Sequence, residues 1–86
     1  MTYKLKFAHR FQKDFAKLDR ETQSRIFVLL ERMTKDPFYG AKKLKNTKVG
    51  IYRIRVGDHR IRFDIEKKSI LLYCLRHRKD VYKDKI

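Results

Sequence analysis

The stretch that decides the fold is IYRIRVGDHRIRF, residues 51–63. Apolar and basic residues alternate on both sides of Gly57-Asp58, and a period of two is typical of strands that bury one face. A two-residue loop with glycine in its first position suits the type II′ turn of a tight hairpin. We therefore expect an antiparallel hairpin made of strands 51–56 and 59–65.

A two-residue turn also fixes the register of this hairpin, which pairs Val56 with His59 and Tyr52 with Phe63. One face then carries the apolar side chains of Tyr52, Ile54, Ile61 and Phe63. The other face carries four arginines, Arg53, Arg55, Arg60 and Arg62. Like charges placed opposite one another destabilise a sheet by roughly a few tenths of a kcal/mol per pair. The pattern therefore has a small folding cost and no folding benefit.

Two interpretations of the four arginines are open. Arginine stems cover apolar surface, and Asp64 or Glu66 offsets some of the charge, so the face would then be an ordinary solvated one. Guanidinium groups also match pairs of phosphate oxygens. We favour a phosphate-binding surface, because a neutral solvent face would interleave more acids with its arginines.

The rest of the chain predicts an α+β fold. Residues 2–7 alternate like a half-buried strand, and from Arg10 the apolar spacing becomes helical. Asp19 is a candidate N-cap for a second helix, which Asp36-Pro37 should end. A lysine-rich loop spans 38–50, and a last strand runs from Ile70 to about His77. The expected order is β-α-α-β-β-β: a small, antiparallel-rich, four-stranded sheet with a helical hairpin packed on one face, in a single domain over 1–86.

Charge points to a polyanionic partner. The 86 residues carry a net charge of +14, and most of the excess falls in the second half of the chain. Cys74 is the only cysteine, which excludes an internal disulfide and a cysteine-based metal site, and its apolar neighbours favour a buried structural thiol. No metal or cofactor is expected. No apolar run is long enough for a membrane span or a signal peptide, so we expect a cytoplasmic protein without membrane contact.

A second basic cluster, LRHRKDVY at 75–82, brings a histidine and a tyrosine into the expected site. Cleaving RNA without a metal requires a base for the 2′-hydroxyl, stabilisation of the phosphorane and an acid for the 5′-oxygen. Arginine serves only the second task, because its pKa exceeds about 12. His77 titrates in the useful range, and Tyr82 can stack on a base or, if strongly perturbed, transfer a proton. Taken alone, a histidine at a strand end is more often just surface.

Three segments in order, KLKN at 43–46, YRIRVGDHRIRF at 52–63 and RHRKDVY at 76–82, resemble the RelE/ParE toxin superfamily, and the resemblance covers nearly the whole chain. It implies an mRNA interferase of the RelE type, the toxin of a type II toxin–antitoxin system. Such a toxin enters the ribosomal A site, cleaves the message there by metal-independent attack of the 2′-hydroxyl, and so inhibits translation.

Residue chemistry and the resemblance together assign two sets of residues. The candidate catalytic residues are Arg55, Arg60, His77, Arg78 and Tyr82. The candidate RNA-binding residues are Arg53, Arg62, Arg76, Lys43, Lys45 and Lys79. Arg53 and Arg55 match positions that are lysines in the best-known RelE type, so no arginine here replaces a lysine base. Proton abstraction would fall to His77, to Tyr82, or to ribosomal RNA and water.

The resemblance also implies partners. These are a cognate RelB-like antitoxin that is acidic and partly disordered, the ribosome with its mRNA, and operator DNA reached only through the antitoxin complex. Two other functions remain open at this point. The first is a ParE-like inhibitor of DNA gyrase without RNase activity, because one fold supports both activities. The second is a noncatalytic nucleic-acid-binding module, in which charge alone accounts for binding.

Overall fold

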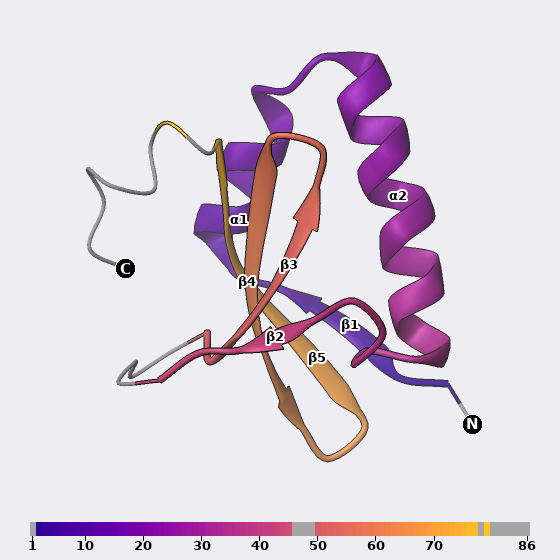
Figure 1. Ribbon diagram of the computed structural model, residues 1–86. Helices are drawn as coiled ribbons and strands as arrows, with labels where there is room; N and C mark the ends of the chain where they lie inside the picture. Colours follow the sequence, from indigo (N-terminus) through magenta and orange to yellow (C-terminus); the bar gives the residue numbers. More distant parts are fainter. Residues whose placement is uncertain (1, 46–49, 78, 80–86) are drawn as a thin grey trace.

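The computed structural model describes residues 2–45, 50–77 and 79. Two helices and five strands follow one another in the chain (Figure 1). Their bounds are β1 (Lys4–Phe7), α1 (His9–Ala16), α2 (Arg20–Lys35), β2 (Lys42–Lys43), β3 (Tyr52–Val56), β4 (His59–Glu66) and β5 (Ser69–His77). The predicted α+β class and the predicted helical hairpin are confirmed.

The strands form one sheet in the order β1-β5-β4-β3-β2. β1 runs parallel to β5, and the other neighbours are antiparallel. The sequence predicted four strands, and this number is wrong by one, because Lys42 and Lys43 form a short edge strand beside β3. Two residues are too few to show an alternating pattern, so β2 arises from pairing with β3 and has no signature in the sequence.

Local signals in the sequence set the bounds of α2. The Asp19 carboxylate accepts a hydrogen bond from the Thr22 N–H at 3.2 Å, as an N-cap should. Hydrogen bonding by the Thr22 side chain, and then by its backbone N–H, stabilises the charged carboxylate and lowers the pKa of Asp19. The helix ends at Lys35, just before Asp36-Pro37, as predicted. Within the described part of the chain, neither helix is both long and apolar enough to cross a bilayer.

The core lies between the two helices and one face of the sheet. It contains Phe11, Ile26, Leu29, Leu30, Met33, Ile54, Ile61, Phe63, Ile70, Leu72 and Leu75. Fully burying one such side chain contributes about 1.5–3 kcal/mol, so this layer accounts for much of the stability. The opposite face of the sheet has no helix among the described elements, and this is the face that receives the arginines.

A bulge in β5 explains why both sets of alternating residues in that strand are apolar. Arg62 is opposite Cys74 and Phe63 is opposite Leu72, so Tyr73 is an extra residue in β5. The side chains of β5 change face at this point. Leu72 therefore faces the helices, whereas Cys74 shares the face of Arg62 and is still buried, which confirms the predicted buried thiol.

Candidate nucleic-acid interface

The β3–β4 hairpin has the predicted register from end to end. Tyr52 lies opposite Phe63, and Val56 lies opposite His59. Gly57 has a φ of 58°, whereas Asp58 is not among the residues with positive φ, which is the pattern of a type II′ turn. Figure 1 shows the hairpin tip close to the start of α2. The turn thus fixes which side chains face solvent.

Four guanidinium groups share the face of the hairpin away from the core, and we call Arg53, Arg55, Arg60 and Arg62 the arginine face. Arg53 is opposite Arg62, and Arg55 is opposite Arg60. Arg55 is exposed and the other three are half-buried. Burial first, and then the charges of the three neighbouring arginines, lower the pKa of Arg53. The four groups are therefore close enough to repel one another.

The arginine face continues onto the neighbouring strands. Lys42 of β2 is opposite Arg53, and Arg76 of β5 is opposite Arg60. Sequence reasoning missed Lys42, because only its pairing with β3 shows which face it shares. It selected Lys43 instead. Lys43 is opposite Tyr52 and therefore belongs to the opposite face of the sheet, although it too is exposed. Lys45 is exposed beyond the end of β2.

Arg62 is tied to the segment that precedes β3. Its Nε donates to the Gly50 carbonyl at 2.8 Å. The Asp64 carboxylate accepts the backbone N–H groups of Gly50 at 3.1 Å and of Ile51 at 2.7 Å. Gly50 has a φ of 64°, and a Cβ there would lie 2.9 Å from the Arg62 Cβ, so this position requires glycine. Arg62 therefore helps to shape the site as well as to charge it.

Tyr73, the extra residue in β5, is a further member of this region that sequence reasoning did not select as a site residue. Burial, together with the charge of Asp64 and a hydrogen bond to its side chain, raises the pKa of Tyr73. The phenol thus stays protonated, and a raised pKa opposes its use as a base. Only the bulge reveals this placement, because regular alternation assigns Tyr73 to the face of Leu75.

Arg76 is held by the first helix. Its Nη1 lies 3.4 Å from Oδ1 of Asp14, and the other carboxylate oxygen accepts the Leu75 backbone N–H at 3.2 Å. The side chains are only 21% and 13% exposed. Asp14 thus accepts a backbone N–H of β5 at a position beyond the last residue pair between β5 and β1. Arg76, predicted to bind RNA, is engaged in this ion pair.

His77 lies on the helix side of the sheet, away from the arginine face. It is opposite His59, and the two rings meet edge to face with centroids 5.2 Å apart. The His77 Nδ1 accepts the Lys79 N–H at 3.1 Å, so the neutral ring carries its proton on Nε2. Both histidines line a pocket of about 140 Å³ together with Arg25 of α2.

Of the predicted catalytic residues, the structure brings Arg55 and Arg60 together. His77 is on the opposite face, and Arg78 and Tyr82 lie outside the described residues. Lys79 is exposed. Among the residues that the structure describes, no three histidine, cysteine or carboxylate side chains are grouped so that they could hold a metal ion.

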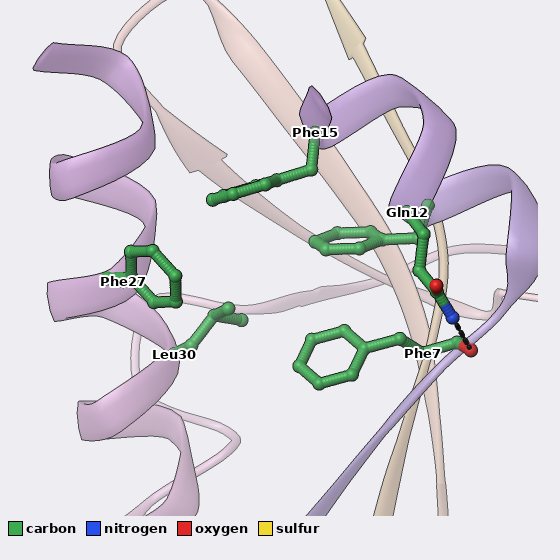
Figure 2. Close-up of a pocket in the computed structure, with 6 residues that line it drawn as sticks. Phe7, Gln12, Phe15, Phe27 and Leu30 are labelled. Atoms are coloured by element: carbon green, nitrogen blue, oxygen red, sulfur yellow. Dashed lines mark hydrogen bonds between the residues drawn. The ribbon is translucent and has the colours of Figure 1, made fainter. Parts of the chain in front are cut away.

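A separate apolar groove lies between the two helices (Figure 2). Phe7, at the end of β1, and Phe15 of α1 reach toward Phe27 and Leu30 of α2 around a space of about 310 Å³. The rings of Phe15 and Phe27 meet edge to face at 5.2 Å, yet Phe27 remains 59% exposed. Apolar surface that stays exposed in this way is available for contact with a partner.

Comparison with known proteins finds relatives that are all toxins of toxin–antitoxin systems. The family model of the ParE toxin of type II toxin–antitoxin systems, parDE, matches residues 5–82. Toxin RelE3 of Methanocaldococcus jannaschii is 30% identical over 83 residues, which cover 92% of this chain and 94% of that protein.

Solved structures agree in fold. A chain of the RelB–RelE antitoxin–toxin complex from Methanococcus jannaschii is 28% identical, with a TM-score of 0.75, over 90% of this chain and 94% of its own length. A chain of the RelBE2 toxin–antitoxin complex from Mycobacterium tuberculosis superposes with a TM-score of 0.80 over 91% of this chain and all of its own length, at 18% identity.

Proposed function

The chain belongs to the RelE/ParE family of type II toxin–antitoxin toxins, and from this premise we propose that it is a ribosome-dependent endoribonuclease. It would cleave mRNA in the ribosomal A site, without a metal, and thereby stop translation. This activity places it where ribosomes work, in the cytoplasm. We propose that residues 1–86 act as one toxin domain.

The observation that carries the proposal is the arginine face. Arg55 and Arg60 are directly opposite each other, and Arg53 and Arg62 form the next pair. Grouping four cations on one face opposes folding, but it is useful for a ligand whose charge grows during reaction. Fixed guanidinium donors can stabilise a phosphorane as oxyanion-hole donors stabilise a tetrahedral intermediate, and removing one oxyanion-hole donor costs about 10²–10³ in rate.

The reaction divides into proton steps and a charge step. The 2′-oxygen attacks phosphorus as its proton leaves to a base, the bond from phosphorus to the 5′-oxygen breaks, and that oxygen takes up a proton. The products are a 2′,3′-cyclic phosphate and a 5′-hydroxyl. We assign the charge step to Arg55, Arg60 and Arg78, because arginine stays protonated.

For the proton steps we propose His77, Tyr82, or ribosomal groups and water. The bond from the Lys79 N–H occupies the His77 Nδ1. A neutral ring with Nδ1 occupied and Nε2 protonated has no free nitrogen to accept a proton, and only the imidazolium would be a useful acid. His77 also lies on the helix side of the sheet, away from Arg55 and Arg60, so it would take part only through a substrate that reaches around the end of β5. For the candidate RNA-binding residues we propose contacts to the message backbone by Arg53, Arg62, Lys43, Lys45 and Lys79, with Arg76 joining them only if its ion pair to Asp14 opens.

The direct test adds the protein to translating ribosomes and maps message ends by primer extension. New 3′ ends within the A-site codon support the proposal, and the same message without ribosomes should stay intact. Absence of A-site cleavage when the added protein is folded would refute it.

A second candidate function comes from the match of residues 5–82 to the family of ParE toxins. A ParE-like toxin would inhibit DNA gyrase and would have no RNase activity. Gyrase-dependent DNA breaks without A-site cleavage would select this candidate. If neither activity is found, and if the affinity for nucleic acids depends on salt concentration and not on their sequence, the chain is a noncatalytic binding module.

We also propose a cognate RelB-like antitoxin as partner, with operator DNA bound only through the toxin–antitoxin complex. Such a chain would be acidic and partly disordered, to neutralise a net charge of +14. We place an apolar helix of this partner in the groove of Figure 2, because the lining of the groove is mostly aromatic and aliphatic and Phe27 in it is largely exposed.

Binding of a purified antitoxin to groove variants tests this placement. Phe27→Asp puts a charge among the groove aromatics and should weaken binding at least tenfold. Val28→Asp is the matched control, since Val28 is 70% exposed and does not line the groove. Equal weakening by both changes would show that added negative charge alone, and not the groove, controls binding.

A further inference from the structure

Two large aromatic side chains are exposed side by side in the turn between α2 and β2. Phe38 is 51% exposed and Tyr39 is 60% exposed. The turn that presents them is well fixed: the Asp36 carboxylate accepts the Phe38 N–H at 3.3 Å, and the Phe38 carbonyl accepts the Ala41 N–H at 3.1 Å. The rings are therefore held at the surface by an ordered turn.

Each ring has its own support. Phe38 meets the ring of Tyr52 edge to face at 5.6 Å, and Tyr52 stacks on the buried Phe63. The Arg32 guanidinium lies 4.6 Å from the centre of the Tyr39 ring. Arginine covers one face of Tyr39, and most of the residue is still exposed. A flat ring fixed in this way is a platform for a second flat ring.

The surroundings of Tyr39 are basic. Over residues 31–45 the exposed cations are Arg32, Lys35, Lys42, Lys43 and Lys45. The same segment holds two acids, Glu31 and Asp36, and the Asp36 carboxylate already accepts a backbone N–H of the turn. A polyanion is therefore favoured over a cationic or a neutral apolar ligand.

Lys42 connects this turn with the arginine face around the edge of the sheet. Lys42 follows Tyr39 by three residues and is opposite Arg53, and Arg53 is opposite Arg62. Tyr39 itself is beside Arg32 of α2, on the helix side of the sheet, so the cations run from the arginine face around the edge strand β2 to Tyr39. Cationic grooves with interspersed aromatic rings bind single-stranded nucleic acid, in which bases stack on the rings.

We propose that Tyr39, backed by Arg32, is a base-stacking subsite for an unpaired nucleotide of RNA whose backbone lies on the arginine face. The proposal rests on the proposed function in that RNA is the ligand. It adds a specific contact outside the reacting phosphate, which would hold the strand in register across β2. Phe38 supports the turn and borders the subsite.

The chain contains no tryptophan, so Tyr39→Trp introduces a single fluorescent indole at the subsite. A short single-stranded RNA oligonucleotide should quench this indole by stacking. An oligonucleotide of equal length with abasic positions has the same charge and should quench much less. Phe27→Trp is the matched control, because Phe27 is equally exposed but lies in the groove between the helices, and RNA should leave its emission unchanged.

Affinity provides the second readout. Tyr39→Ala should weaken RNA binding about tenfold, as expected for loss of one stacked base. Tyr39→Phe should stay within about twofold, because a phenyl ring stacks as well as a phenol. Equal quenching by the normal and abasic oligonucleotides, or no effect of Tyr39→Ala, would overturn the proposal. Quenching by an acidic helical peptide and not by RNA would overturn it in favour of a protein partner.

The fate of this proposal can be separated from that of the proposed enzyme. If the chain binds RNA with stacking at position 39 and cleaves nothing on the ribosome, the enzymatic proposal fails and the subsite stands. If the chain cleaves A-site codons while Tyr39→Ala and Tyr39→Trp show no stacking, the subsite fails and the enzyme stands.

Discussion

Removing one charge from the arginine face should make the protein more stable. Arg53 is opposite Arg62, diagonal to Arg60, and two residues from Arg55 on its own strand. Cross-strand diagonal neighbours are about 7 Å apart, and two unit charges at about that distance in water repel by about 0.6 kcal/mol. Screening at about 0.1 M salt halves this to about 0.3 kcal/mol. Three neighbours together therefore cost roughly 1 kcal/mol.

Arg53→Met keeps the length of the stem and removes the charge, so urea unfolding should show a gain of up to about 1 kcal/mol at about 0.1 M salt. The gain should shrink near 1 M salt, where the Debye length falls to about 3 Å. Lys6→Met is the matched control, because Lys6 is an exposed strand residue opposite Leu71. An Arg53→Met protein that is less stable than the parent, or whose stability follows salt as the parent does, would refute the idea that the face is strained by its own charge.

Three further predictions concern the groups around the face. Asp14→Ala removes the acceptor of a β5 backbone N–H and the partner of Arg76, and should cost about 2 kcal/mol in chemical unfolding; an unchanged midpoint would contradict this. Gly50→Ala forces a strained φ and a contact with Arg62, and should lower the melting temperature by several degrees, with about 1 kcal/mol or more lost. Folding raises the pKa of Tyr73. The contribution of this group to the free energy of unfolding is therefore complete at pH values below its pKa in the unfolded chain, and it is lost as the pH rises through its pKa in the folded protein. The Tyr73→Phe variant should therefore lose less stability than the parent between neutral and strongly alkaline pH.

The sequence was informative where structure is set locally. The turn at Gly57-Asp58 and the alternating residues beside it are enough to fix register, so the pairing of Arg55 with Arg60 was predicted correctly. Asp19 and the pair Asp36-Pro37 mark the bounds of α2 for equally local reasons. Each of these features depends on neighbours within a few residues.

Features set by distant contacts were not predictable in this way. β2 exists because Lys42 and Lys43 pair with β3, and the bulge at Tyr73 depends on how β5 meets β4. His77 was grouped with the arginines because it is close to Arg76 in sequence. A strand alternates its faces, so one residue of separation places the imidazole on the helix side of the sheet.

The central claim is that the arginine face stabilises the transition state of RNA cleavage, and the rate of A-site cleavage under single-turnover conditions tests it most directly. Arg60→Ala should lower this rate by about 10²-fold or more. Arg20→Ala removes the same charge from the exposed start of α2 and should change the rate by no more than a few-fold. Equal losses in the two variants would contradict the claim, because they would mean that only total charge matters.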